Sequence, residues 1–171
     1  YLVEQLLTIE PRFNSKIFFQ SNIFHSDIFL CTGNDFSAKY FDFKLNSKPR
    51  IIRDSKASIA ILDGDETKQH IRLLMKDVFL YFGLGCRNVS KLYIPRNYDL
   101  QSIKEYFLDY NHLLKYSFYF DNYIYYKTLY TLKKKTFLDF ESVLLLESKE
   151  LFSPISVLYY EYYDEESDIS L

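Results

Sequence analysis

The feature that most constrains this chain is an amphipathic stretch that leads through a glycine-rich turn into an apolar segment. Apolar residues recur at Ile71, Leu74, Met75, Val78 and Phe79, which is the spacing of one helix face. A Gly-Leu-Gly-Cys turn follows, and then the apolar run Val89–Ile94, which Pro95 closes. Helix, turn and buried strand in this order predict an α/β fold.

The same alternation occurs earlier in the chain. Asp27–Cys31 is predicted as a buried strand, Thr32-Gly33-Asn34 as a turn and Asp35–Leu45 as a helix. Tyr116–Tyr130 is rich in aromatic residues, and its pattern does not decide between helix and strand. Further strands are predicted at Lys16–Phe19, Arg50–Arg53, Ala57–Leu62, Val143–Leu146 and Ile155–Tyr162, and further helices at Tyr1–Thr8 and Ser102–Leu114. We therefore expect a largely parallel sheet with flanking helices.

Composition narrows the classes of function. The formal net charge of -2 provides no general field that would attract nucleic acid or an anionic membrane. Two cysteines are too few for a disulfide framework, which favours a reducing, cytoplasmic location. No apolar run approaches the roughly 20 residues of a membrane span. The acidic end, Glu161–Asp168, is expected to be solvated.

The cysteine of the glycine-rich turn is the main candidate for chemistry. Two of the four glycines in the chain, Gly83 and Gly85, flank the approach to Cys86. Glycine lets a substrate come close to the backbone, the neighbouring Arg87 favours a thiolate, and the peptide N–H of Cys86 can face an oxyanion. The alternative is a buried structural cysteine, which is the commoner role of a single cysteine.

A family resemblance adds weight to the catalytic interpretation. The run Tyr81–Pro95, Tyr-Phe-Gly-Leu-Gly-Cys-Arg-Asn-Val-Ser-Lys-Leu-Tyr-Ile-Pro, resembles the nucleophile segment of the LuxC-type acyl-CoA reductases. These fatty-acid reductases belong to the aldehyde dehydrogenase superfamily, whose general pattern is Gly-Gln-x-Cys followed by a strand. Leu84 and Gly85 depart from that pattern in a way that resembles the acyl-CoA reductase branch. The resemblance implies that Cys86 is the catalytic nucleophile.

Three further segments resemble the superfamily in the same order along the chain. The turn at Thr32, Gly33 and Asn34 is similar to the Thr-Gly-Ser turn at the phosphates of the nicotinamide cofactor. Ile51–Glu66 is similar to the strand region that opens the catalytic domain. Glu150–Val157 resembles a Glu-Ile-Phe-Gly-Pro-Val segment, with Ser153 in place of glycine. This implies that Glu150 binds a cofactor ribose and that Phe152 lies near the nicotinamide.

The resemblance covers about Asp27 to Tyr163 and implies an aldehyde dehydrogenase-like, three-layer domain with a mostly parallel sheet, truncated at its N-terminus. Residues 1–49 would be the C-terminal part of the cofactor-binding domain, 50–150 the catalytic domain, and 151–171 a return segment towards the cofactor domain. Because the chain begins at Tyr1 within a helical pattern, we expect a C-terminal fragment that is inactive by itself.

The implied reaction is NADPH-dependent reduction of a fatty acyl-CoA, most simply a long-chain one, to the aldehyde. CoA is released and the acyl group is carried on the cysteine. NADH in place of NADPH, and a CoA-acylating aldehyde dehydrogenase that works in the oxidative direction, are the alternatives. An acyl-protein synthetase or acyltransferase partner and a homo-oligomer are expected from the same resemblance.

One absence bears on the reaction. Hydrolytic members of the superfamily carry a Glu-Leu-Gly-Gly segment whose glutamate activates the deacylating water. The matching region here is Ile52-Arg53-Asp54-Ser55, which has neither the glutamate nor the glycine pair. Without that base, an acyl-enzyme is expected to resist hydrolysis and to react with CoA or a hydride instead. Asp54 is either a displaced base or a solvated aspartate at a strand end.

Two other classes of function were weighed. Lys115–Lys135 interleaves Tyr and Phe with Lys, which is also a pattern of single-stranded nucleic-acid binding. The net negative charge opposes that interpretation, so we expect no nucleic-acid partner. We expect instead an aromatic wall that either packs on the core or faces an absent N-terminal half. A relative without catalytic activity is opposed by Cys86 and Glu150. The histidines and cysteines lack the spacing of metal ligands, and Cys31 is expected in the core.

Overall fold

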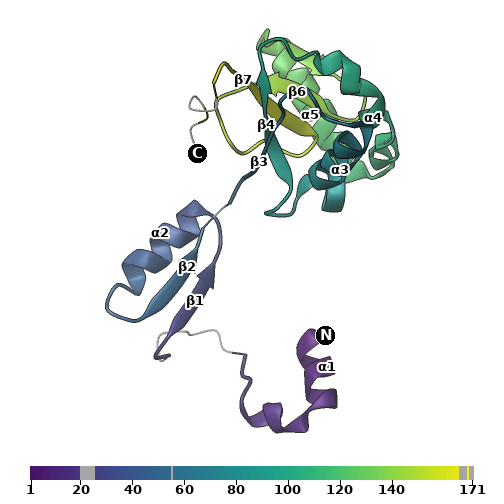
Figure 1. The fold of residues 1–171 in the computed structure, drawn as a ribbon. Coiled ribbons are helices and arrows are strands. Elements are labelled where there is room, and N and C mark those ends of the chain that lie inside the picture. The colour runs from purple at the N-terminus through teal and green to yellow at the C-terminus, as the bar shows by residue number, and fades with distance from the viewer. Residues whose placement is uncertain (20–25, 55, 166–168, 170–171) are drawn as a thin grey trace. The chain divides into compact units, whose positions relative to one another are not determined.

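The computed structural model describes residues 1–19, 26–54, 56–165 and 169. It forms two compact units, Tyr1–Ser55 and Lys56–Leu171 (Figure 1). Ser55, which belongs to the segment compared with the deacylating glutamate, lies outside the described residues, as do residues 166–168 of the acidic end. No helix within the described part is long and apolar enough to cross a bilayer.

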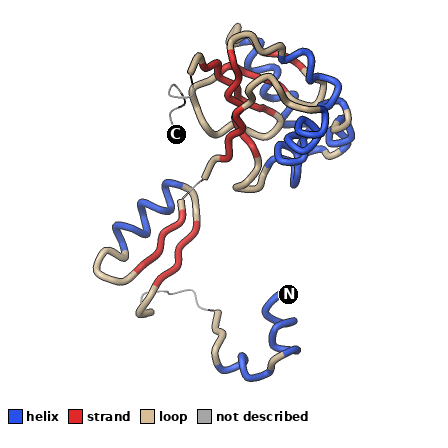
Figure 2. Tube along the Cα trace, viewed as in Figure 1, coloured by secondary structure: helices blue, strands red, loops and turns tan. Residues whose placement is uncertain are grey.

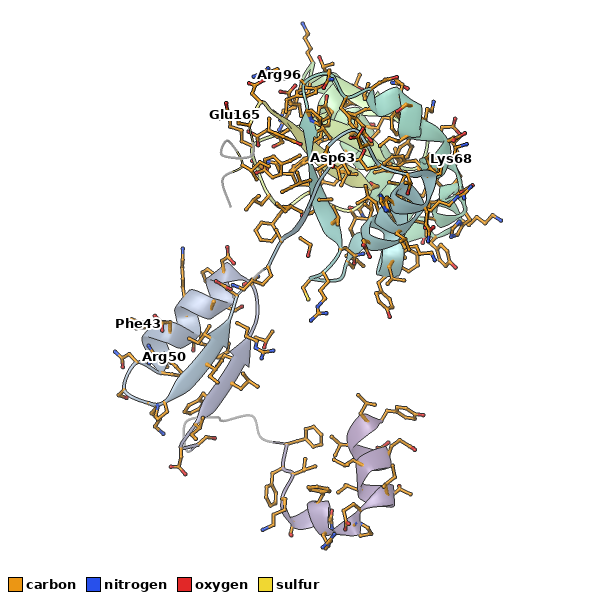
Figure 3. The ribbon with its side chains drawn as sticks, in the orientation of Figure 1. Phe43, Arg50, Asp63, Lys68, Arg96 and Glu165 are labelled. Atoms are coloured by element: carbon orange, nitrogen blue, oxygen red, sulfur yellow. The ribbon has the colours of Figure 1, made fainter. Side chains whose placement is uncertain are left out.

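The first unit contains a small βαβ element. Strand β1 (Phe29–Thr32) leads into helix α2 (Asp35–Lys44) and then into strand β2 (Arg50–Arg53), which pairs with β1 in parallel. Phe29, Cys31 and Leu45 form its buried core, which confirms the expected core position of Cys31. The Arg50 guanidinium bonds Asp42 at 2.6 Å, and Figure 3 labels Arg50 on β2.

Two features of this unit differ from or extend the prediction. Helix α1 (Leu2–Ile9) is present as expected, and the 3-10 helix η1 (Pro11–Ser15) follows it. The strand predicted at Lys16–Phe19 is wrong: these residues have no strand geometry, and Phe18 and Phe19 are exposed. A short apolar run needs a partner strand, and none of the described residues pairs with this one.

The second unit is built on a five-stranded sheet in the order β3-β4-β7-β6-β5. Neighbouring strands are parallel except for β5 and β6, which are antiparallel. The strands are β3 (Ser58–Ile61), β4 (Val89–Pro95), β5 (Phe137–Asp139), β6 (Leu144–Glu147) and β7 (Val157–Tyr163). The largely parallel sheet is confirmed, whereas the three-residue strand β5 was not predicted.

Helix α3 (Lys68–Phe79) connects β3 to β4 and has the predicted apolar face. The Thr67 hydroxyl caps it by accepting from the His70 N–H at 3.2 Å, which confirms the predicted cap. Ile71, Met75 and Phe79 of this face are buried in the main core. The helix therefore covers one face of the sheet, against Leu92 and Ile94 of β4 and Leu158 of β7.

The opposite face of the sheet packs on the aromatic segment that the sequence left undecided. This segment forms helix α5 (Ser117–Leu132). Successive residues of a strand point to opposite faces, so Val157 and Tyr159 point away from Leu158. They form a second core cluster with Tyr123 and Tyr130 of α5. Figure 2 shows the helices of this unit in blue beside its red strands. Of the two arrangements expected for the aromatic wall, packing on the core is seen for the buried tyrosines of α5, whereas Phe118, Phe120 and Tyr125 are exposed.

The predicted helix Ser102–Leu114 is broken into three short pieces. These are η3 (Leu100–Ile103), α4 (Lys104–Leu108) and η4 (Asn111–Lys115). Four of the six predicted apolar positions, Ile103, Tyr106, Phe107 and Leu113, are buried, and Tyr110 and Leu114 are half-buried against the core, because 3-10 turns also bring residues three apart to one side. The Phe79 and Tyr110 rings stack at 4.4 Å and join this segment to α3.

The acidic end Glu161–Asp168 was expected to be solvated, and this is wrong for its first three residues, which belong to β7 and are half-buried. Glu161 lies in β7 and pairs with Lys91, whose side chain is fully buried in β4. A buried ammonium requires a charged partner, so Glu161 is held in the sheet. Beyond it, Arg96 pairs with Asp164 at 2.6 Å, and Figure 3 labels Arg96 and Glu165 near the ends of these two strands.

Candidate active site around Cys86

Cys86 lies in the turn that connects the end of α3 to β4, and its side chain is exposed. The 3-10 segment η2 (Leu80–Gly83) precedes it. Tyr81, Phe82 and Gly83 have φ values of 52°, 62° and 74°, so three consecutive residues are left-handed. Such a conformation costs a residue other than glycine about 1–2 kcal/mol. The surrounding structure must therefore hold Tyr81 and Phe82 in place.

The ring of Phe82 provides part of that support. Its centroid lies 5.0 Å from the ring of Tyr116, 4.8 Å from that of Phe118 and 6.5 Å from that of Tyr119. The first two contacts are edge-on, which is a favourable aromatic geometry, and Tyr119 is 1% exposed. Aromatic residues at the start of α5 thus help to hold the left-handed segment in place.

Asn88 ties the cysteine turn to the end of α3. Its side-chain oxygen accepts from the Gly85 N–H at 2.7 Å, and its amide nitrogen donates to the Asp77 carbonyl at 2.7 Å. The Asn88 N–H also donates to the Gly85 carbonyl at 2.9 Å and closes the turn. Asn88 is only 9% exposed, so these bonds are shielded from water. The turn that carries Cys86 is therefore fixed on both sides.

Ser90 connects strand β4, which follows the Cys86 turn, to the segment that contains Glu150. Its hydroxyl donates to the Leu151 carbonyl at 2.6 Å, across 61 positions in the sequence. A cavity of about 30 Å³ lies beside this contact, lined among others by Phe82, Gly83, Ser153 and Pro154. Two of the predicted site segments are thus brought together within the second unit.

The Glu150 carboxylate is oriented by a tyrosine of β7. The Tyr159 hydroxyl donates to Glu150 at 3.4 Å. Burial raises the pKa of Tyr159, a hydrogen bond with Tyr130 opposes the rise, and the Glu150 carboxylate adds to it. Tyr159 therefore stays protonated and able to donate at neutral pH. Glu150 itself is exposed, as is Phe152, which is 49% exposed.

The predicted phosphate turn lies in the first unit, between β1 and α2. The Gly33 N–H donates to the Arg53 carbonyl at 3.1 Å, and the Asn34 side chain caps α2 by accepting from the Ser37 N–H at 2.9 Å. A Cβ added at Gly33 would lie 2.8 Å from that of Ser37. Thr32 ends β1 and is exposed. Gly33 is thus required for close packing of the turn on the helix.

No group of three or more potential metal ligands occurs among the residues that the structure describes. His112 contacts the Asp109 carbonyl at 3.0 Å, which is a local structural contact. Lys127 belongs to the aromatic segment whose pattern is also one of nucleic-acid binding. Its ammonium pairs with Asp139 at 2.6 Å and donates to the Tyr123 hydroxyl at 3.1 Å.

Solved structures with the same arrangement of strands and helices identify the fold. An aldehyde dehydrogenase from Bacillus cereus superposes with a TM-score of 0.61 at 11% identity, over 83% of this chain and 36% of that one. The fold is that of the aldehyde dehydrogenases. The gamma-glutamyl-gamma-aminobutyraldehyde dehydrogenase of Burkholderia cenocepacia J2315 gives 0.58 at 12% identity, over 83% and 36%. The chain thus spans about a third of the length of these proteins.

The Staphylococcus aureus betaine aldehyde dehydrogenase, solved in complex with NAD+, gives a TM-score of 0.54 at 12% identity, over 82% of this chain and 35% of that one. No family model matches the sequence, and no curated protein matches it. The α/β fold of aldehyde dehydrogenase type is therefore shown, and the reaction is a matter for proposal.

Three residues of this candidate site were not singled out from the sequence. Asn88 and Ser90 follow the cysteine closely, but polar residues beside a turn and within a strand usually indicate solvent exposure. Tyr159 lies in the mostly apolar run Ile155–Tyr162 that was predicted as a strand, and nothing in that run indicates a polar contact for it. All three act through hydrogen bonds to residues far away or to the backbone, which no periodicity in the sequence reveals. The roles of Cys86, Thr32, Gly33, Asn34, Glu150 and Phe152 stay predictions.

Proposed function

We propose that this chain is part of an acyl-CoA reductase in which Cys86 carries the acyl group. The observation that supports this most strongly is that the Cys86 thiol is exposed on a turn held in one conformation. The residues Tyr81 and Phe82 before it have a left-handed backbone, and the Asn88 side chain after it binds the turn. Structural cysteines are usually buried and need no such support, as Cys31 illustrates. Rigid presentation of an exposed sulfur is what a nucleophile requires.

The backbone beside Cys86 offers a place for negative charge. Within the described residues, no acceptor bonds the N–H of Cys86, whereas the N–H of Gly85 is already bound by Asn88. A free N–H next to the sulfur can stabilise the oxyanion that forms when the thiolate attacks a carbonyl. The exposed side chain of Arg87 adds a positive charge at the next position in the chain.

The proposed reaction begins with attack of the Cys86 thiolate on the acyl-CoA carbonyl. A bond forms between sulfur and the acyl carbon, the bond to the CoA sulfur breaks, and CoA leaves as a thiolate that takes a proton from solvent. The acyl group is then held on Cys86 as a thioester, whose carbonyl is still electrophilic. After reduction of that carbonyl, the carbon–sulfur bond breaks, the aldehyde leaves and the thiolate is restored.

A bound nicotinamide cofactor would supply the hydride for this reduction and is itself oxidised. The residues present fit such a group. Gly33 and Asn34 form a βα turn at the start of a helix, a place suited to phosphate, and Glu150 presents an exposed carboxylate for ribose hydroxyls. Thr32 and Phe152 complete the proposed contacts, and NADPH is the proposed form.

The fate of the acyl group favours reduction over hydrolysis. Hydrolysis of an acyl-cysteine needs a base that activates water, and the corresponding region carries Asp54 instead of glutamate. Asp54 is exposed directly after β2. We propose that the acyl-enzyme therefore persists until it meets a hydride or CoA. A fatty acyl chain is the proposed substrate, with an acyl-protein synthetase or acyltransferase as the proposed partner in a homo-oligomeric, cytoplasmic enzyme.

The division into domains stays a prediction, and its predicted boundaries can be compared with the two units of the structure. Arg50–Arg53, expected to open the catalytic domain, pairs with β1 inside the first unit. Val157–Tyr163, expected to return towards the cofactor domain, lies between β4 and β6 in the second unit. We propose that the first unit serves cofactor binding and that the second carries the nucleophile.

The test is an assay of the complete protein with NADPH and acyl-CoAs of graded chain length. Aldehyde formation with matching release of CoA and oxidation of NADPH supports the proposal. Oxidation of an aldehyde to acyl-CoA with no detectable reduction would point to the oxidative alternative. Absence of both activities in a folded protein would contradict the proposed function.

A further inference from the structure

We infer that Asn88 is a positioning residue that aims the backbone N–H of Cys86 at the oxyanion, an inference that rests on the proposed role of Cys86. The hydrogen bonds of the Asn88 side chain go to backbone groups, so its proposed effect passes through the turn. Its side chain uses both ends of its amide: the oxygen accepts from Gly85, and the nitrogen donates to Asp77.

The direction of the turn depends on these bonds. The bond from the Gly85 N–H holds the Leu84–Gly85 peptide, one peptide group before the one that carries the Cys86 N–H, and the bond to Asp77 fixes Asn88 on the last turn of α3. A second, weaker contact runs from the same nitrogen to the Val78 carbonyl at 3.4 Å. Because the Asn88 N–H also bonds the Gly85 carbonyl, both peptide groups of Gly85 are held. The Gly85 carbonyl and the Cys86 N–H belong to one planar peptide group, so the bond to that carbonyl sets the direction of the Cys86 N–H.

The same arrangement explains which N–H groups are left for the substrate. Without Asn88, the N–H of Gly85 would compete with that of Cys86 for any anion near the turn. With Asn88 in place, that of Gly85 is occupied, while that of Cys86 has no acceptor within the described part of the chain. Asn88 thus selects one donor and sets its direction, which is preorganisation of the kind that stabilises an oxyanion.

A comparison of two reactions of the same thiol separates this role from a merely structural one. Acylation by 4-nitrophenyl acetate passes through a tetrahedral oxyanion and releases 4-nitrophenolate. Alkylation by iodoacetamide displaces iodide at a saturated carbon and forms no oxyanion. A change in the amount or pKa of the thiolate affects both rates, whereas loss of an oxyanion donor affects acylation alone. The ratio of the two rates at Cys86, followed by peptide mass spectrometry, is therefore the readout.

In the complete protein, Asn88→Ala and Asn88→Asp are compared with the wild type. Both remove the donation to the α3 carbonyls, and we expect either to lower the ratio of acylation to alkylation, with about a tenfold loss or more for Asn88→Ala. Ser142→Ala is the control, because it removes a buried hydroxyl that contacts the Phe107 carbonyl away from the turn. It should leave the ratio unchanged even if it lowers stability.

An unchanged ratio in whichever Asn88 variant folds would overturn the inference. The result is independent of the proposed function, because the ester and iodoacetamide need no recognition of CoA or of a cofactor. If the wild type forms no adduct from acyl-CoA but the Asn88 variants lower the ratio, the proposed function fails and the positioning role stands. If the wild type reduces acyl-CoA and the ratio does not change, the opposite holds.

Discussion

A Cβ added to Gly85 would lie 2.7 Å from the side-chain oxygen of Asn88, closer than real Cβ contacts allow. The same two residues share a 2.7 Å hydrogen bond from the Gly85 N–H to that oxygen. The two distances describe the same contact. The Asn88 oxygen can come this close to the Gly85 backbone only because glycine has no Cβ. Gly85 is thus required by its contact with Asn88, one position before the proposed nucleophile.

Gly85→Ala should therefore destabilise the protein by about 1–3 kcal/mol, because the turn must open and the buried amide loses a partner. The clash depends on Asn88, so the same change in an Asn88→Ala background should cost clearly less. Urea unfolding of the wild type, the two single variants and the double variant gives the coupling. Equal costs of Gly85→Ala in both backgrounds would show that the contact has no energetic role.

Ser90→Ala removes the donor to the Leu151 carbonyl and should loosen the segment that carries Glu150 and Phe152. We expect the KM for the cofactor to rise severalfold while alkylation of Cys86 by iodoacetamide stays at the wild-type rate. Ser102→Ala is a matched control, since its hydroxyl makes a comparable 2.6 Å bond to the Asp99 carbonyl elsewhere. A change in thiol reactivity without a change in KM would refute this role for Ser90.

The sequence predicted the elements that repeat a pattern and missed those that depend on distant partners. The apolar face of α3, its Thr67 cap and the strand Val89–Pro95 follow from local spacing. Helix α5 did not, because aromatic residues on several of its sides leave no single apolar face. The break at Leu108–Asn111 and the three-residue strand β5 depend on packing against β6 and the core.

The candidate site shows the same division. The place of Cys86 in an exposed turn between a helix and a strand could be predicted, because glycines mark such turns in the sequence, whereas its role as a nucleophile stays a prediction. The Ser90–Leu151 bond joins residues 61 positions apart, so only the folded sheet brings them together. The left-handed Tyr81 and Phe82 could not be anticipated either, since neither residue type favours that conformation.

Glu150→Gln tests the proposed cofactor contact. The amide keeps the shape of the side chain and can still accept from Tyr159, but it loses the charge that binds ribose hydroxyls strongly. We expect the KM for NADPH to rise about tenfold, in line with loss of a charged hydrogen bond of about 1.5–3 kcal/mol. Glu147→Gln, an exposed glutamate at the end of β6, is the control. Unchanged binding and turnover would remove Glu150 from the proposed site.

The pair formed by Asp139 and Lys127 should make stability depend on pH at the acid end. Burial opposes ionisation of Asp139, but hydrogen bonds from Lys127 and Tyr123 outweigh it and hold the pKa of the carboxyl below its ordinary value. A lowered folded-state pKa stabilises the protein above the unfolded value of about 3.9, and this contribution is lost as pH falls through the folded pKa.

Asp139→Asn should therefore lower the unfolding midpoint at pH 6 and reduce the loss of stability that occurs as pH falls below the unfolded-state pKa of about 3.9. Asp121→Asn, on the same helix as Lys127 but exposed, should leave that change as in the wild type. Thermal unfolding followed by circular dichroism measures both. If the unfolding midpoint of Asp139→Asn depends on acid pH as strongly as that of the wild type, the pH dependence arises from other carboxyl groups.

The central claim is that Cys86 carries the acyl group, and intact-protein mass spectrometry tests it most directly. The complete protein is incubated with a long-chain acyl-CoA in the absence of NADPH. We predict a mass increase of one acyl group, located at Cys86 by peptide mapping, that disappears with release of aldehyde when NADPH is added and is absent from Cys86→Ala. Aldehyde formation by Cys86→Ala at the wild-type rate, or an adduct located at another residue, would contradict the account.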